Sequence, residues 1–191
     1  MVITDEHLIQ RTLAGSQAAF GQLIARYQDF VFSLCMRVLG SREEAEETAQ
    51  DAFLKVYHNL STFKQESRFS TWLYTLTYRT ALDRARLRKR PVQALETDEY
   101  VLQVEDKSTA APDANLHQAD LQDQLEHAIN QLKPDAASVV SLYYLQEQSV
   151  KEIAEVTGLT ETNVKTKLFR SREALRDLLR QSLQQEARQM I

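Results

Sequence analysis

The sequence predicts an all-α protein with two small helical domains that are joined by an acidic flexible linker. Only 4 glycines and 3 prolines occur in 191 residues, whereas β-sandwiches and barrels need these residues in their many turns. Alanine, leucine, glutamine, glutamate and arginine are abundant, and all of them favour helices. Residues 91–130 carry nine acidic side chains and one basic one, between two blocks that are close to neutral or weakly basic. This acidic middle marks the connection between the domains.

The composition also excludes several classes of protein. Cys35 is the only cysteine, so a disulfide framework and a zinc site built from thiolates are ruled out. No apolar run reaches the roughly 18 residues that a membrane span needs. The N-terminus carries Asp5 and Glu6 instead of the basic start of a signal peptide. We therefore expect a cytoplasmic protein without direct membrane insertion.

Helical periodicity and capping residues divide residues 1–91 into four helices, which form a small bundle with its own core. The expected helices cover 5–13, with Asp5 as its cap; 16–39, closed by Gly40; 41–60, opened by a capping box at Ser41 and Glu44; and a last one from Ser67 or Ser70 to the basic run at 84–90. Pro91 ends the last helix, and the linker follows over residues 92–118.

Residues 119–191 form the second domain, in which the expected order of helices is that of a helix-turn-helix. The helices cover 121–132; about 134–145, starting at Pro134; 150–157, between a capping box at Ser149 and Glu152 and a turn at Gly158; and about 161–184, capped by Thr160. A short helix, a glycine turn and a capped longer helix are typical of this DNA-binding motif.

The outward face of the last helix can read DNA. With Val164 and Leu168 facing the core, this face carries Lys165, Thr166, Phe169 and Arg170. Lysine and arginine can reach phosphates or guanine edges in the major groove, and a threonine methyl or an aromatic ring can meet thymine methyls. Two antiparallel helices of an ordinary bundle would show the same pattern.

Aromatic and basic residues alternate from Phe63 to the end of the basic run. They are Phe63, Lys64, Arg68, Phe69, Trp72, Tyr74, Tyr78, Arg79, Arg84, Arg86, Arg88, Lys89 and Arg90. This combination is typical of surfaces that bind unstacked single-stranded nucleic acid. Alternatively, Phe69 and Trp72 are core residues, the tyrosines lie on an amphipathic surface, and the basic run is a solvated helix end that the helix dipole favours.

Several acidic residues gather on the helix expected over 41–60, but nothing indicates an enzyme. A carboxylate-bridged metal bundle would need Glu-x-x-His on its helices, and the chain contains no such triplet. The four histidines are scattered, and there is no phosphate-binding glycine loop, nucleophile elbow or Cys/His cluster. We therefore expect no catalytic residue, metal or cofactor, and we interpret the acidic residues as a docking or solvated face.

Three segments together resemble the bacterial sigma-70 family of RNA polymerase sigma factors, in particular its extracytoplasmic-function (ECF) group. Residues 41–63 (SREEAEETAQDAFLKVYHNLSTF) are similar to the second conserved region, residues 63–90 to the adjoining segment that melts and reads the minus-ten element, and residues 150–175 (VKEIAEVTGLTETNVKTKLFRSREAL) to the fourth region. Relatives often have asparagine where this chain has Arg79, so their minus-ten preference does not transfer.

The resemblance implies a factor that initiates transcription without being an enzyme and that binds core RNA polymerase and promoter DNA. Residues 1–91 would bind polymerase and recognise and melt the minus-ten element, and residues 119–191 would recognise the minus-thirty-five element. The residues implied in polymerase binding are Glu46, Glu47, Gln50, Asp51 and Leu54. Those implied at minus-ten DNA are Phe63, Lys64, Arg68, Trp72, Arg79, Arg84 and Arg86, with a flipped base held by loop 63–71. Those implied at minus-thirty-five DNA are Lys165, Thr166, Phe169, Arg170 and Arg172.

The resemblance also implies an anti-sigma partner that covers the polymerase-binding and DNA-reading faces. Alternatively, the linker packs the two domains against each other and the protein inhibits itself, although nothing in the sequence suggests a large permanent interface. Two other functions are compatible with parts of the chain. A stand-alone helix-turn-helix regulator leaves the face from Glu46 to Leu54 unused, and a helical interaction module without nucleic acid leaves Phe169 and Arg170 unexplained.

Overall fold

The computed structural model describes residues 3–88 and 124–189, and every regular element in these stretches is helical. The first stretch contains α1 (Asp5–Leu13), α2 (Gln17–Leu39), α3 (Arg42–Asn59), the 3-10 turn η1 (Leu60–Thr62) and α4 (Phe69–Arg88). The second contains a helical segment at 124–130, α6 (Pro134–Tyr144), α7 (Val150–Thr157) and α8 (Glu161–Gln189). The all-α class is confirmed for these residues. The expected linker and the end of the basic run lie outside them.

Local capping signals account for most helix boundaries. Gly40 and Gly158 follow α2 and α7 with φ of 67° and 73°, in the left-handed region where glycine carries no Cβ penalty. The capping box at the start of α7 is complete: Ser149 Oγ accepts from the Glu152 N–H, and the Glu152 carboxylate accepts from the Ser149 N–H at 2.8 Å. These three predictions are confirmed.

The predicted cap of α1 is wrong. Thr4 occupies the N-cap position, and its side-chain oxygen accepts from a backbone N–H in the first turn. The Asp5 carboxylate instead accepts hydrogen bonds from Arg26 and Tyr27 on α2. A tertiary contact with α2 therefore takes the carboxylate that the sequence assigned to local capping.

The capping box predicted at the start of α3 is only half formed. Ser41 Oγ accepts from the Glu44 N–H at 3.4 Å, as expected. The Glu44 carboxylate does not return the bond, because it accepts from the Arg88 guanidinium on α4 at 3.0 Å. This ion pair joins α3 to the C-terminal end of α4.

α4 is enclosed on more than one side. Tyr74 is fully buried and Tyr78 is 6% exposed, so the alternative that placed the tyrosines at the surface is wrong. The hydroxyls of Thr75, Thr77 and Thr80 donate to backbone carbonyls one turn back, which satisfies these donors within α4 itself. The Thr80 hydroxyl also accepts from Lys55 Nζ on α3 at 3.2 Å. α4 can therefore be buried widely although its sequence shows no single apolar stripe.

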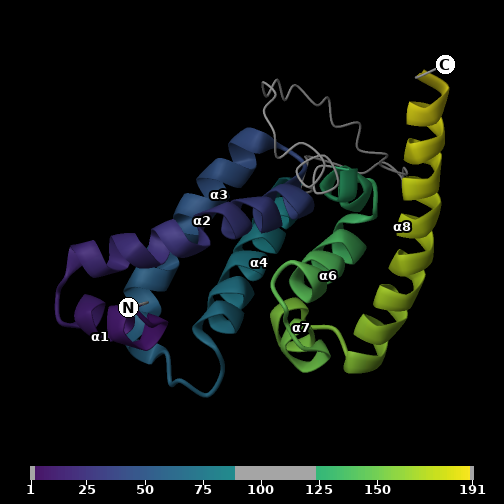
Figure 1. The fold of residues 1–191 in the computed structure, drawn as a ribbon. Coiled ribbons are helices and arrows are strands. Elements are labelled where there is room, and N and C mark those ends of the chain that lie inside the picture. The colour runs from purple at the N-terminus through teal and green to yellow at the C-terminus, as the bar shows by residue number, and fades with distance from the viewer. Residues whose placement is uncertain (1–2, 89–123, 190–191) are drawn as a thin grey trace.

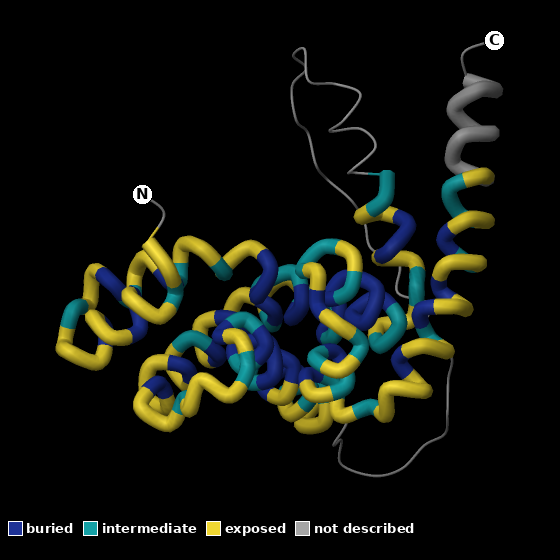
Figure 2. The backbone as a smooth tube through the Cα atoms, turned by 60° about the horizontal axis from the view of Figure 1, so that its bottom comes forward, coloured by how far each residue is buried: buried dark blue, intermediate teal, exposed yellow. Residues whose placement is uncertain are grey.

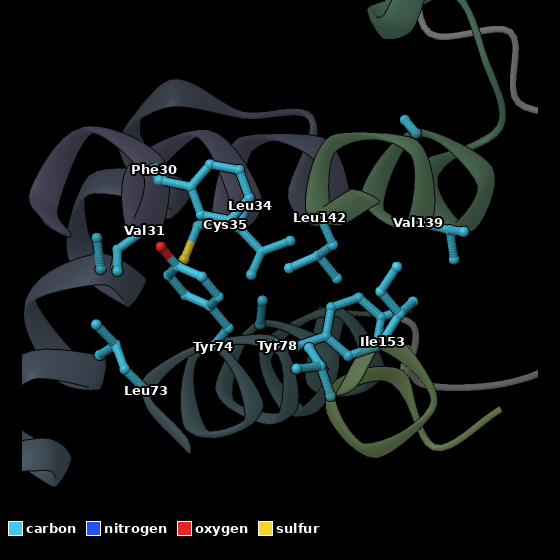
Figure 3. Packing of buried hydrophobic residues seen from close by; sticks show 14 of the residues in the cluster. Phe30, Val31, Leu34, Cys35, Leu73, Tyr74, Tyr78, Val139, Leu142 and Ile153 are labelled. Atoms are coloured by element: carbon cyan, nitrogen blue, oxygen red, sulfur yellow. The ribbon is translucent and has the colours of Figure 1, made fainter. Parts of the chain in front are cut away.

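The helices of the two halves share one hydrophobic core. In Figure 1, α4 lies between α2 and α3 on one side and α6 and α7 on the other, and α4 packs on α7 while α2 packs on α6. Figure 3 shows side chains from both halves in a single cluster, among them Leu34, Tyr78, Leu142 and Ile153. Buried positions collect where the helices meet, and the outer side of α8 is exposed over residues 161–180 (Figure 2). The sequence did not suggest so extensive a contact.

Candidate functional site

α3 presents a continuous exposed face. All five residues that the resemblance assigned to polymerase lie on it and are exposed: Glu46, Glu47, Gln50, Asp51 and Leu54. Ala45, Ala52 and Val56 occupy the opposite, buried face of the helix. Leu54 is 58% exposed, so this face presents a large apolar side chain among its acidic ones. The arrangement suits a docking surface with acidic and apolar parts.

Tyr57 belongs to the same face, although it is not among the residues that the resemblance implied in polymerase binding. It lies three residues after Leu54, and residues at this spacing are neighbours on a helix surface. Tyr57 is 44% exposed, and its ring lies 4.9 Å from that of Phe20 between centroids. The helical spacing from Leu54 was the signal that could have identified it.

Charge on this face is partly neutralised within the protein. Arg42 Nε binds the Glu46 carboxylate at 2.9 Å, and Arg84 Nη2 on α4 binds that of Glu47 at 2.5 Å. Among the described residues, Asp51 forms no ion pair. Asp51 therefore offers an uncompensated negative charge beside the exposed Leu54.

An aromatic cluster surrounds the loop between η1 and α4. The ring of Phe63 lies 5.3 Å from that of Trp72 and 5.7 Å from that of Phe69, between centroids. A surface pocket of about 380 Å³ opens here, lined by residues 65–69 together with Phe63, Glu6 and Ile9. Gln65 in this loop has a φ of 59°, a left-handed conformation that a residue with a Cβ adopts at some cost. The loop is thus held around a hollow with an aromatic wall.

The seven residues implied at minus-ten DNA are not all in one place. Phe63, Lys64, Arg68 and Trp72 surround the loop and the start of α4, Arg79 is exposed further along the helix, and Arg84 and Arg86 lie near its C-terminal end. At a rise of about 1.5 Å per residue, these positions extend along most of α4. Arg84 is turned toward α3 by its ion pair with Glu47. Arg68 binds Glu152 on α7.

α7, Gly158 and α8 form the expected helix-turn-helix. Val164 is fully buried and Leu168 is 4% exposed, which fixes the inner face of α8. The four residues predicted on its outward face are all exposed: Lys165, Thr166, Phe169 and Arg170. The Phe169 ring is 62% exposed. A solvent-exposed aromatic between basic side chains is suited to contact base edges in a major groove.

Arg172 differs from these four residues. Its Nε donates to the Tyr144 hydroxyl at 2.5 Å, and its guanidinium lies 6.0 Å and 5.8 Å from the ring centroids of Tyr143 and Tyr144. The arginine is exposed but rests on the end of α6. The DNA contact that the resemblance implies for Arg172 would therefore require it to leave Tyr144.

The described part of the chain offers neither a metal site nor a membrane-spanning helix. No group of three or more histidine, cysteine, aspartate or glutamate side chains there could hold a metal ion. None of the helices described is both long enough and apolar enough to cross a membrane.

Comparison with known families identifies both halves. Residues 23–91 match the Sigma-70 region 2 family, and residues 122–175 match Sigma-70, region 4. These two ranges contain the α3 face, the aromatic loop and the outward face of α8 up to Arg172.

Relatives that match over nearly the whole chain are also sigma factors. The chain is 32% identical over 185 residues to the ECF RNA polymerase sigma factor SigW of Bacillus subtilis, covering 90% of this chain and 95% of the relative. It is 30% identical over 188 residues to the RNA polymerase sigma-H factor of Pseudomonas aeruginosa, covering 96% and 97%.

Solved structures share the fold. The sigma factor RpoE of Bartonella quintana, in complex with the anti-sigma factor NepR, matches with a TM-score of 0.63 at 24% identity, over 84% of this chain and 96% of that one. CnrH in complex with the cytosolic domain of CnrY matches with a TM-score of 0.57 at 24% identity, over 92% and 96%.

Proposed function

This chain belongs to the extracytoplasmic-function group of the sigma-70 family of RNA polymerase sigma factors, and from this premise we propose how its surfaces divide the work. As a member of this family, it binds core RNA polymerase and directs promoter-specific initiation of transcription. A stand-alone helix-turn-helix regulator is not favoured, because the region 2 match accounts for the α3 face that such a regulator would leave unused.

In the proposal, residues 1–91 bind polymerase and read and melt the minus-ten element, and residues 119–191 read the minus-thirty-five element. The α3 face meets polymerase, with Asp51 supplying charge and Leu54 supplying apolar surface. Phe63 and Trp72 stack on unpaired bases beside the loop, and the basic residues of α4 hold the strand. The chain itself carries out no chemical reaction and acts in the cytoplasm.

The observation that carries the proposal is the outward face of α8. Phe169 is 62% exposed between Lys165, Thr166 and Arg170, on a helix whose other face is held by Val164 and Leu168. The mixture of basic, hydroxyl and aromatic side chains on this outward face fits the base edges and phosphates of a major groove. α8 is therefore assigned to the minus-thirty-five element.

An anti-sigma factor is the proposed regulatory partner. One of the similar solved structures is a complex of a sigma factor with an anti-sigma factor. The exposed apolar residues Leu54 and Phe169 lie on the faces that such a partner would cover.

Co-purification and promoter protection test the proposal together. The tagged chain is expected to retain core polymerase, and the mixture is expected to protect a promoter from about the minus-thirty-five to the minus-ten element. Protection of an operator by the chain alone, with no retention of polymerase, would instead support a stand-alone regulator.

A further inference from the structure

One contact between the two halves involves a residue assigned above to promoter DNA. The Arg68 guanidinium, just before α4, binds the Glu152 carboxylate on α7 through two hydrogen bonds: Nε to Oε1 and Nη2 to Oε2, both at 2.6 Å. Nη2 also donates to the Glu147 carbonyl at 3.3 Å. Glu147 has a φ of 49°, a left-handed conformation that is uncommon for a residue with a Cβ. Arg68 is thus held from three acceptor atoms on the C-terminal half.

A polar layer continues this contact along α4. Thr71 Oγ1 donates to Gln148 Oε1 (2.9 Å), Gln148 Nε2 donates to Ser70 Oγ (3.3 Å), and the Tyr74 hydroxyl donates to Gln146 Oε1 (2.5 Å). Thr71 is fully buried and Gln148 is 2% exposed. Leaving a buried polar group without a hydrogen bond costs free energy, so these bonds favour this alignment of the two halves. Apolar neighbours such as Tyr78 and Ile153 close the rest of the interface.

In this contact the Arg68 guanidinium binds an anionic group, the Glu152 carboxylate, through both of its oxygens. A guanidinium binds a carboxylate and a phosphate with the same two-pronged geometry. The hydrogen bond from Arg68, together with those from Ser149, lowers the pKa of Glu152 to about 2. The carboxylate is therefore ionised at neutral pH and presents two charged oxygens where a DNA phosphate would present its own.

We propose that residues 146–152 act as an intramolecular latch, in which Glu152 stands in for a DNA phosphate on Arg68 and keeps the free chain from engaging the minus-ten strand. This inference rests on the proposed assignment of Arg68 to promoter DNA. The other binding faces stay open in the latched form, because Leu54 on α3 is 58% exposed and Phe169 on α8 is 62% exposed. Polymerase and duplex DNA can therefore dock before the latch opens, and the opening releases Arg68 to the melted strand.

A matched pair of variants isolates the charge of Glu152. Glu152→Gln removes the charge but keeps a side chain that can complete a capping box. Glu155→Gln removes one charge from an exposed position on the same helix. The probe is a short single-stranded DNA oligonucleotide of mixed sequence, and its binding to the full chain is followed by fluorescence anisotropy. Glu152→Gln is expected to bind several-fold more tightly than Glu155→Gln. Equal affinities for the two variants would overturn the latch.

Adding Arg68→Ala shows whether Arg68 is what the latch releases. In the Glu152→Gln background, this substitution is expected to abolish the gain in affinity. A gain that persists without Arg68 would overturn the phosphate stand-in and the minus-ten role of Arg68, without bearing on polymerase binding, which the co-purification tests separately.

The opening of the latch can also be measured in the absence of DNA, as a change in the distance between the two halves. Dyes on Ala25→Cys and Glu173→Cys, two exposed positions on α2 and α8, report the separation of the halves by energy transfer. Cys35 is buried, and burial raises the pKa of its thiol to about 12, so labelling is directed to the introduced cysteines. Glu152→Gln is expected to lower the transfer efficiency, because the two halves are then further apart in more of the molecules. Glu155→Gln is expected to leave the efficiency unchanged. A distribution that Glu152→Gln does not alter would contradict the latch.

Discussion

Arg84 on α4 donates a hydrogen bond to Glu47 on α3, with 2.5 Å between Nη2 and Oε2. The pair joins a residue assigned to minus-ten DNA to one assigned to polymerase. Both side chains are partly exposed, at 38% and 54%, so the pair by itself contributes about 0–1 kcal/mol to stability. If the proposed roles hold, a polymerase group that binds Glu47 would compete with Arg84 for the carboxylate, and we expect this to make the guanidinium available to the DNA strand.

Reversing the charge of Asp51 should weaken the association with polymerase. Asp51 is exposed and unpaired among the described residues, beside the exposed Leu54, so Asp51→Lys places a like charge against whatever basic group it meets. Core polymerase binding, measured by titration with a labelled chain, is expected to weaken while the helical circular dichroism and thermal midpoint stay near those of the wild type. Asp29→Lys, at an exposed position on α2, is the control for the change in net charge. Equal binding by both variants would remove Asp51 from the interface.

Removing the Phe63 ring should impair melting more than duplex binding. The ring is half-buried against Trp72 and Phe69 beside the loop pocket, and stacking of a base on an aromatic side chain is worth about 1–3 kcal/mol. Permanganate reactivity of thymines in the minus-ten region is expected to fall for Phe63→Ala, with duplex affinity nearly retained. Phe32→Ala removes a half-buried ring on α2 and is the control, which should leave permanganate reactivity near that of the wild type. Unchanged permanganate reactivity with Phe63→Ala would place the unpaired base elsewhere.

Arg170 should read sequence, whereas basic residues further along α8 should contact phosphate. A bidentate contact with guanine makes Arg170→Ala cost about 1–3 kcal/mol at the specific promoter and little elsewhere. Arg176→Ala should weaken all sequences about equally and reduce the salt slope by about one. Affinities for the promoter and for a scrambled duplex, measured over a range of salt, separate the two cases. Equal losses on both DNAs for Arg170→Ala would move Arg170 to the phosphate contacts.

The Arg68–Glu152 pair predicts a dependence of stability on acid. The pKa of Glu152 is about 2 in the folded chain, below its ordinary value of 4.5, so the carboxylate stabilises the fold above pH 4.5 and loses this contribution as the pH falls toward 2. The effect should be about 1 kcal/mol or less, because the Arg68 side chain is 52% exposed. Urea unfolding of wild type and Glu152→Gln is expected to give a difference that is constant from pH 7 to 5 and shrinks below 4.5. A constant difference down to pH 3 would contradict the pairing.

Local signals in the sequence predicted most of the fold. Gly158 and Ser149 act within one turn of their own helix, so neither depends on the rest of the chain. The outward face of α8 was also predictable, because Val164 and Leu168 fix the inner face and the helical period then places Phe169 outside.

Contacts between distant helices could not be predicted in this way. Arg68 and Glu152 are 84 positions apart, and no period or cap connects them. The position of Asp5 in the sequence is that of a helix cap, but Arg26 and Tyr27 on α2 donate hydrogen bonds to its carboxylate. The burial of α4 was equally hidden in the sequence, because its threonines are polar. Their hydroxyls donate to backbone carbonyls of the same helix, and this allows them to be buried.

Reconstituted transcription tests the central claim most directly. Core RNA polymerase of the source bacterium is combined with the chain on genomic DNA fragments, and the 5′ ends of the transcripts are mapped with and without it. The account predicts new start sites that share a minus-thirty-five and a minus-ten element, that require the chain, and that are lost with Arg170→Ala while polymerase binding is kept. A chain that binds core polymerase yet produces no new start sites, or start sites that are insensitive to Arg170→Ala, would contradict it.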